Sequence, residues 1–309
     1  MKLRKYILTV MIGITAMTVL SSCANKENAV KGQPDQSTQE IFAMDTYMSL
    51  TAYGSNSEEA VNKAVQEINR LDAMFSVGNE DSDVTKLNEN GSGEVSEETA
   101  FIMNRAMQVS EKTNGAFDIT IYPLMELWGF TTKNYRVPES SEIAEALKGV
   151  SYTNVSVKGQ QVALTGGSSI DLGGIAKGYT SSRVIQIMKD YGIEHAIVNL
   201  GGNVQVLGTK TDGSDWRVAI QDPASENSYL GILSTADKAV ITSGGYERYF
   251  EQDGQVYHHI IDTQTGYPSD SDLTSVTIVY SDGTTADALS TALFAMGLDG
   301  AKDFTEAVI

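Results

Sequence analysis

The sequence predicts an α+β fold. Runs typical of strands are grouped in the middle of the chain, between residues 155 and 220, and helical patterns lie on both sides of them. Strands and helices do not alternate regularly, as they would in a βαβ protein with a parallel sheet. With 309 residues and 41% hydrophobic content, the chain can bury one large core or two fused lobes. No internal repeat and no linker is found after residue 40, which favours one folded region over residues 40–309.

The first 22 residues are typical of an export signal. Three of the first five residues are basic, and an apolar run over residues 6–20 follows. That run is short for a transmembrane helix, which needs about 20 apolar residues. Small residues then lead into Cys23, the only cysteine of the chain, in a pattern that resembles a bacterial lipobox. We expect residues 1–22 to be a lipoprotein signal peptide and Cys23 to carry lipid, so that the protein is exported and lipid-anchored to the bacterial cell membrane. The alternative is a secretory signal with an incidental cysteine.

Composition limits the partners that the chain can have. Residues 23–39 are mostly polar and contain Gly and Pro, so we predict a lipidated, flexible tether there. A single cysteine leaves no thiol for a disulfide or a zinc cluster. The net charge of -18 repels nucleic acid, and no basic patch offsets it, so nucleic acid is excluded as a partner. The same charge repels nucleotide phosphates, so a phosphate site must be built locally from a cation, glycine-rich backbone or a helix N-terminus.

The first elements of the folded region follow from periodicity and capping residues. Alternating residues between 42 and 50 predict one strand. Ser57 is expected to cap a helix whose apolar stripe runs over residues 61–71. A second helix is expected from a Ser96 cap to Asn114-Gly115, a pair that suits the left-handed position at a helix end.

The later elements are predicted from the same patterns. Strands there are short and are separated by glycine-rich turns. We predict helices over residues 138–147, 175–191 and 286–297, and strands over residues 155–157, 162–164, 196–200, 204–207, 216–220 and 276–280.

A glycine pair opens one of these helices and is flanked by charge. Gly173 and Gly174 follow Asp171, and Lys177 lies in the first helical turn. Such a turn lets backbone approach a phosphate or a metal ion, and the helix N-terminus adds a favourable potential. The spacing matches neither a Walker A loop nor the dinucleotide fingerprint. Taken alone, the pair is more often a purely structural turn.

A carboxylate and a hydroxyl lie one turn apart at the start of the last helix. Asp287 and Thr291 are four residues apart and therefore share a helix face. Two such oxygens can serve Mg²⁺, which keeps few protein ligands besides water and substrate phosphate. The alternative is that Asp287 only interacts with the helix dipole and Thr291 fills space.

Two of the three histidines are adjacent, at His258 and His259, on a predicted strand. Neighbours on a strand point to opposite faces, so only one of them can face a given cleft. An imidazole can take a proton from an attacking hydroxyl near neutral pH. Adjacent strand histidines cannot chelate one zinc ion. The alternative is a surface histidine beside a half-buried one.

Phe117 and Asp118 follow the Asn114-Gly115 helix end, with Trp128 and Phe130 shortly after them. An aromatic ring and a carboxylate on a loop could stack on a nucleobase and hydrogen-bond to it. Equally, these aromatic side chains could fill the core, which is their commoner place in proteins.

Together and in this order, these segments resemble the ApbE family, the FAD:protein FMN transferases. No single segment is decisive, but the ordered set is specific and covers nearly all of the chain from residue 42 onward. The matching segments are residues 44–46, 75–76, 81–88, 115–118, 123–124, 128–130, 171–178, 199–203, 242–245, 259–262 with 265–266, and 286–291.

The resemblance implies a fold and a reaction. The fold would be an ApbE-type, T-fold-like catalytic domain with mixed or antiparallel sheets and packed helices. The reaction would be Mg²⁺-dependent transfer of FMN from FAD to a Ser or Thr hydroxyl of an acceptor protein, with release of AMP. The acceptors implied are membrane redox subunits or secreted flavoproteins that carry a short flavinylation motif.

The resemblance also assigns roles to single residues. His259 would be the general base. The metal ligands would be Asp287, Thr291 and the backbone carbonyl of Gly174. The FAD contacts would be Met44, Ala116, Phe117, Asp118, Asp171, Lys177 and Ile261.

The chain departs from the family pattern at two places. Many relatives carry an aromatic residue two positions after the serine that matches Ser76, and here that position is Gly78. Weaker flavin stacking keeps open an FAD pyrophosphatase, which would use water and release FMN and AMP. A non-catalytic flavin-binding lipoprotein is the rival from another class. Relatives also continue with a closing strand segment beyond the position of Ile309, so C-terminal truncation is a further alternative.

Overall fold

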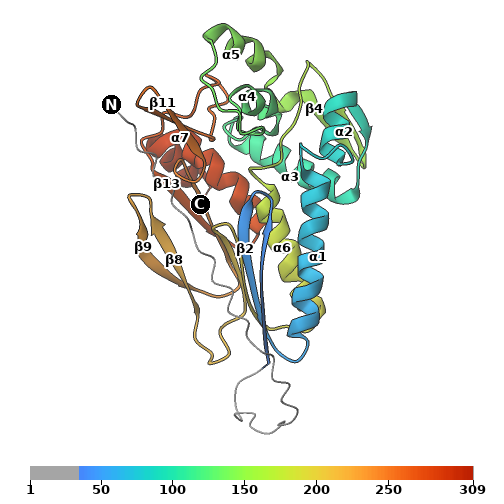
Figure 1. Cartoon of the computed structure of the whole chain (residues 1–309), viewed down its shortest axis with the longest axis vertical. Helices are drawn as coiled ribbons and strands as arrows, with labels where there is room; N and C mark the ends of the chain where they lie inside the picture. Colours follow the sequence, from blue (N-terminus) through green and yellow to red (C-terminus); the bar gives the residue numbers. More distant parts are fainter. Residues whose placement is uncertain (1–34, 309) are drawn as a thin grey trace, which may run out of the picture. The chain divides into compact units, whose positions relative to one another are not determined.

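The computed structural model describes residues 35–308 (Figure 1). The predicted signal peptide, Cys23 and most of the tether lie outside these residues. Within them, helices and antiparallel sheets are mixed, as the α+β prediction requires. No helix in the described part of the chain is both long and apolar enough to cross a bilayer.

The largest sheet has six strands in the order β1-β2-β6-β7-β10-β13, with antiparallel neighbours throughout. Its strands are β1 (Gln36–Ala43), β2 (Thr46–Tyr53), β6 (His195–Leu200), β7 (Asn203–Leu207), β10 (Ala239–Gly244) and β13 (Ser275–Tyr280). The prediction of a single strand over residues 42–50 was therefore wrong. Met44 and Asp45 have positive φ angles of 48° and 59° and turn the chain into a hairpin. Residues 36–39, predicted as tether, belong to β1.

Three long helices pack together beside this sheet (Figure 1). They are α1 (Ser57–Phe75), α6 (Ala176–Asp190) and α7 (Gly283–Val308). One core cluster joins α1 and α6 to the inner faces of β2 and β6 through residues such as Ile68, Val184 and Val198. Ile197 points the other way and packs with the hairpin of β8 (Trp216–Asp222) and β9 (Ser225–Thr235), because successive strand residues alternate in direction.

The smaller elements divide between two further core clusters, a second one beside the start of α6 and a third one around Trp128 and Phe130. These elements are α2 (Asp83–Asn90), β3 (Ser92–Glu94), α3 (Glu97–Lys112), α4 (Tyr122–Leu127), α5 (Ser140–Ala146), β4 (Val155–Lys158), β5 (Gln161–Leu164), β11 (Tyr249–Gln252) and β12 (Gln255–His258), with short 3-10 turns at Ile119–Ile121, Leu147–Gly149 and Tyr152–Asn154. The order of the three-stranded sheet is β3-β5-β4. Its core joins α2, α3 and the start of α6, which places the glycine pair next to the second core.

The capping predictions can be checked directly. Ser96 caps α3 and accepts a hydrogen bond from Thr99 N at 3.1 Å, and Asn114 and Gly115 have the expected positive φ angles of 50° and 81°. Ser57 is the first residue of α1 instead of its cap, and Asn56 precedes it. The last helix begins at Gly283, not at residue 286, and continues beyond a break at Gly297. Strands β3, β9, β10 and β11 and helices α2 and α4 were not predicted.

Candidate functional site

One cavity of about 1030 Å³ is lined by every FAD, metal and base residue predicted above. These residues come from the β1–β2 turn, the loop after α3, the start of α6, the loop after β12 and helix α7. They are Met44, Ala116, Phe117, Asp118, Asp171, Gly174, Lys177, His259, Ile261, Asp287 and Thr291. The structure thus gathers residues as far apart in sequence as Met44 and Thr291, while the individual roles remain predictions.

Asp287 is buried at the crossing of α6 and α7. Its Oδ2 accepts a hydrogen bond from Gly178 N at 2.8 Å, and its Oδ1 accepts one from Asn203 Nδ2 at 3.0 Å. A Cβ atom on Gly178 would lie only 2.2 Å from the Gly283 carbonyl oxygen, so glycine is required for this approach. Burial raises the pKa of Asp287, and the charge of Lys177 opposes that shift. The carboxylate is therefore held firmly in a place where a cation would stabilise its charged form.

Further oxygen atoms lie close to this carboxylate. Thr291 is one helical turn after Asp287, and its Oγ1 lies 3.3 Å from Ser243 Oγ. A Cβ atom on Gly174 would lie 3.7 Å from this Oγ1 and 3.0 Å from a ring carbon of Phe117. A side chain at Gly174 would fill this space. Residues 35–308 contain no group of three His, Cys, Asp or Glu side chains suited to a metal ion, so a metal here would need the hydroxyl and backbone oxygens.

The loop before α6 carries the second predicted carboxylate. Asp171 Oδ1 accepts a hydrogen bond from Gly173 N at 2.6 Å, while Asp171 N donates to the Ile119 carbonyl at 2.8 Å. Burial raises the pKa of Asp171, and the charge of Arg248 lowers it. This loop is fixed by its own backbone, and its carboxylate faces the cavity together with Lys177.

Phe117 and Asp118 have structural contacts as well as positions at the cavity. Phe117 is buried in the second core. Asp118 Oδ1 accepts from Thr120 N at 2.8 Å and from Thr120 Oγ1 at 2.7 Å, and its Oδ2 accepts from Tyr152 N at 2.6 Å. Burial raises its pKa, and these hydrogen bonds counter the shift. The core alternative therefore holds for Phe117, and Asp118 stabilises the loop through these hydrogen bonds, alongside any contact with a ligand.

The two adjacent histidines have different surroundings. His258 accepts from Ile260 N at 3.3 Å and lies 3.1 Å from the Ser269 carbonyl, so both of its ring nitrogens have protein partners. His259 lines the cavity, and its Nδ1 lies 3.1 Å from the Arg248 carbonyl. A carbonyl can only accept, so Nδ1 carries the proton and Nε2 is left as the basic nitrogen. Burial, Arg248 and Lys177 lower the pKa of His259 to about 3, which keeps the ring neutral.

Arg248 and Glu247 also line the cavity and were not predicted as site residues. They lie between the matching segments 242–245 and 259–262, where no motif drew attention to them. Gln221, Pro223 and Tyr229 at the end of the β8–β9 hairpin were missed as well, because β9 itself was not predicted. The only available signal for Arg248 was its charge within an acidic chain.

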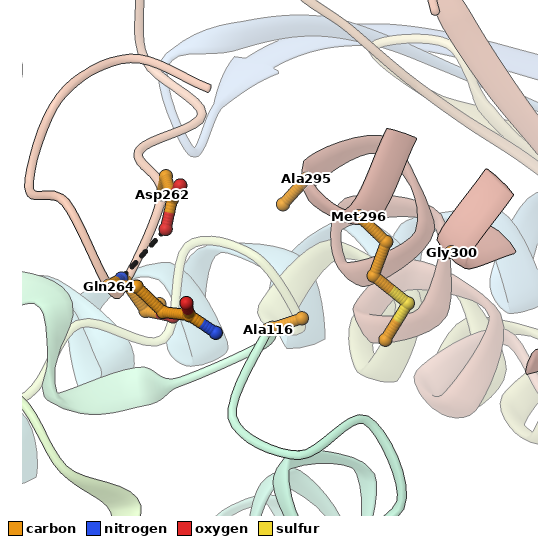
Figure 2. Close-up of a pocket in the computed structure, with 7 residues that line it drawn as sticks. Ala116, Asp262, Gln264, Ala295, Met296 and Gly300 are labelled. Carbon is orange, nitrogen blue, oxygen red and sulfur yellow. Dashed lines mark hydrogen bonds between the residues drawn. The ribbon is translucent and has the colours of Figure 1, made fainter. Parts of the chain in front are cut away.

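A smaller pocket of about 310 Å³ lies beside the main cavity, and Ala116 and Thr263 line both. Figure 2 shows the loop of Asp262 and Gln264 on one side and Ala295 and Met296 of α7 on the other. Asp262 Oδ1 accepts from Gln264 N at 2.7 Å, which closes the turn.

The chain is similar to curated proteins with one activity name and to solved structures of ApbE proteins. Among curated relatives, an FAD:protein FMN transferase of Klebsiella pneumoniae is 34% identical over 79% of this chain and 78% of its own length, and one of Treponema pallidum is 32% identical over 84% and 78%. Among solved structures, the ApbE protein of Thermotoga maritima has a TM-score of 0.83 and 40% identity, covering 88% of this chain and 92% of its own. The flavinyl transferase ApbE of Pseudomonas stutzeri has a TM-score of 0.81 and 28% identity, covering 91% and 90%. The ApbE family model matches residues 44–308. The chain therefore belongs to the ApbE family.

Proposed function

We propose that this chain is an FAD:protein FMN transferase that requires Mg²⁺ and transfers FMN to a Ser or Thr hydroxyl of an acceptor protein, with release of AMP. The names of its relatives support the transfer of FMN from FAD. The observation that carries the proposal is the neutral His259, with Nε2 as its basic nitrogen, in the cavity that also contains Asp287 and Thr291. Capture of flavin alone would need neither a base nor such a cluster of oxygens.

The oxygen cluster fits Mg²⁺. A buried carboxylate with a raised pKa, a hydroxyl and a backbone carbonyl at a position without a side chain are hard ligands of the type this ion prefers. Asp287, Thr291 and the carbonyl of Gly174 would hold the ion. When bound, it would supply Lewis-acid stabilisation of charge on the diphosphate of FAD.

The side chains of the chain itself account for the proton transfer. His259 Nε2 takes the proton of the acceptor hydroxyl, whose oxygen forms a bond to the FMN phosphorus. The bond from that phosphorus to the bridging oxygen breaks, and AMP leaves with the bridging oxygen. The Arg248 carbonyl holds the imidazole in the required tautomer throughout, at 3.1 Å from Nδ1. Lys177 places a positive charge beside the dianionic diphosphate in an otherwise acidic cavity.

We also propose export and lipidation at Cys23, which the signal-like sequence before it supports. Anchoring would place the site at a membrane surface, where redox subunits with exposed flavinylation motifs are candidate acceptors. The lipid is tested by mass spectrometry of the mature protein, with Cys23→Ser as the control that cannot be acylated.

One experiment separates the possible activities. The protein is incubated with FAD, Mg²⁺ and a candidate acceptor, then denatured, and flavin fluorescence is measured in the acceptor band. Acceptor whose target hydroxyl residue is changed to Ala serves as the control. Fluorescent acceptor supports transfer. Free FMN and AMP without labelled acceptor would replace the proposal by hydrolysis, the alternative kept open by Gly78, and intact FAD would contradict both.

A further inference from the structure

We infer that Arg248 binds the FMN-side phosphate of FAD, as a second cationic group beside Lys177. This inference rests on the proposed function. Arg248 lies outside the segments that match the family. Its backbone carbonyl orients His259, and its side chain is the part that we assign to the phosphate.

The charges around the cavity show the need for such a group. Lys177 and Arg248 are the only lysine and arginine among the residues that line it. Six lining carboxylates oppose them: Asp45, Asp72, Asp118, Asp171, Glu247 and Asp287. Within residues 35–308, neither cation forms an ion pair closer than 4.0 Å, although eight such pairs form elsewhere. Both are therefore available to a dianionic ligand, which an acidic cavity would otherwise repel.

The position of Arg248 indicates which phosphate it binds. The Arg248 carbonyl accepts from both the backbone N and the Nδ1 of His259, at 3.0 Å and 3.1 Å, so the two residues are fixed next to each other. The charge of Arg248 acts on His259 and on Asp171 and is not among the charges that act on Asp287, whereas the charge of Lys177 acts on both His259 and Asp287. Together with the backbone contact to His259, this places Arg248 nearer to the base than Lys177 is. The phosphorus attacked by the hydroxyl that His259 deprotonates must lie near the base too, and in FAD that is the FMN phosphate.

The guanidinium chemistry suits this role. Its planar fork can donate two hydrogen bonds to non-bridging phosphate oxygens, and such charge-assisted bonds are stronger than neutral ones. A bound phosphate would also offset the positive charge that weakens His259 as a base in the free protein. The FAD phosphate would therefore make the base more basic at the moment it is needed.

The test uses Arg248→Gln, Arg248→Lys and a matched control, Arg217→Gln, which removes an exposed arginine of β8 that does not line the cavity. Affinities for FAD, FMN, AMP and riboflavin are measured by fluorescence and competition in Mg²⁺ buffer, with thermal melting to check folding. We expect Arg248→Gln to weaken the binding of FAD and FMN by about tenfold or more, which is the size of a lost charged hydrogen bond. The affinities for AMP and riboflavin should stay within about twofold of the native values. Arg248→Lys should restore part of the loss.

Three results would overturn the inference. The first is an unchanged affinity for FAD and FMN. The second is a loss of affinity for AMP with none for FMN, and the third is an equal loss of affinity for all four ligands, riboflavin included. If the native protein fails to label any acceptor while the affinity pattern holds, the proposed function fails and the phosphate contact stands.

Discussion

The two sides of the cavity are held in place by different means. On the metal side, Asp287 is buried between two helices, and both of its oxygens accept hydrogen bonds, from Gly178 N and Asn203 Nδ2. On the base side, His259 lies just after the short β11–β12 hairpin, and its ring is held by the Arg248 carbonyl and by edge-on packing against Phe130. The difference teaches that the predicted metal side is fixed by hydrogen bonds between two helices, while the base side is fixed by one backbone carbonyl and by aromatic packing.

The largest effect is expected from His259→Ala. Loss of the base should slow transfer on the order of 10²–10⁴-fold, while FAD affinity changes little, because the imidazole acts on the acceptor hydroxyl and is not among the predicted FAD contacts. Single-turnover labelling of an acceptor measures the rate. His258→Ala is the comparison: both ring nitrogens of His258 have protein partners, so stability should fall and the chemical step should not. Unchanged turnover in His259→Ala would remove this residue from the mechanism.

Asp287→Asn tests whether the metal side binds a cation. The gain in FAD affinity on adding Mg²⁺ should be lost, as measured by FAD titration with and without the ion. The pKa of Asp287 is raised by burial, so its ionised form costs stability at neutral pH, and that cost falls as the pH drops through the raised value. The variant removes this buried charge but also loses one of the two hydrogen bonds that Asp287 accepts, because an amide has a single accepting oxygen, so thermal melting without Mg²⁺ serves to check that the variant folds. Equal FAD affinity with and without Mg²⁺ in the native protein would contradict the metal assignment.

Gly178→Ala should lower the stability of the metal side of the cavity, where α6 and α7 cross. A Cβ here would meet the Gly283 carbonyl at 2.2 Å and Asp287 Cβ at 2.5 Å, so α6 and α7 must move apart. We expect a loss of about 1–3 kcal/mol in the free energy of unfolding, measured by denaturant titration. Gly231→Ala is the control, since nothing lies within 4 Å of its Cβ position. A native-like unfolding midpoint for Gly178→Ala would show that the helix crossing is less tight than described.

The smallest effect is expected from a lower pH acting on kcat/KM. The pKa of His259 is lowered to about 3, below the ordinary histidine value of about 6.5, so the ring stays in its proton-accepting form as the pH falls from 8 to 5. The profile of kcat/KM at saturating Mg²⁺ should then show no inflection near 6.5. An inflection there that is absent from a His258 variant would indicate that the wrong histidine had been assigned.

Much of the fold could be predicted from local patterns. The Ser96 cap, the Asn114-Gly115 helix end and most strands follow from nearest-neighbour chemistry, and the structure agrees with them. The strand over residues 42–50 was wrong because alternation continues through the turn, and only the positive φ angles at Met44 and Asp45 reveal the hairpin.

The site residues themselves could be named only through the family pattern, since no motif alone favoured a functional explanation over a structural one. Arg248 and Glu247 lie outside the matching segments, and only the folding of the β11–β12 hairpin brings them to the cavity. Long-range placement of this kind leaves no periodic trace in the sequence.

The main-chain contact that orients His259 has an evolutionary consequence. A carbonyl is present whatever amino acid occupies position 248, so mutation there can alter substrate preference without disturbing the tautomer of the imidazole. Selection could therefore explore new side chains at this position in descendants of the enzyme while the tautomer is inherited unchanged, and the loss of the Arg248 charge would raise the pKa of His259.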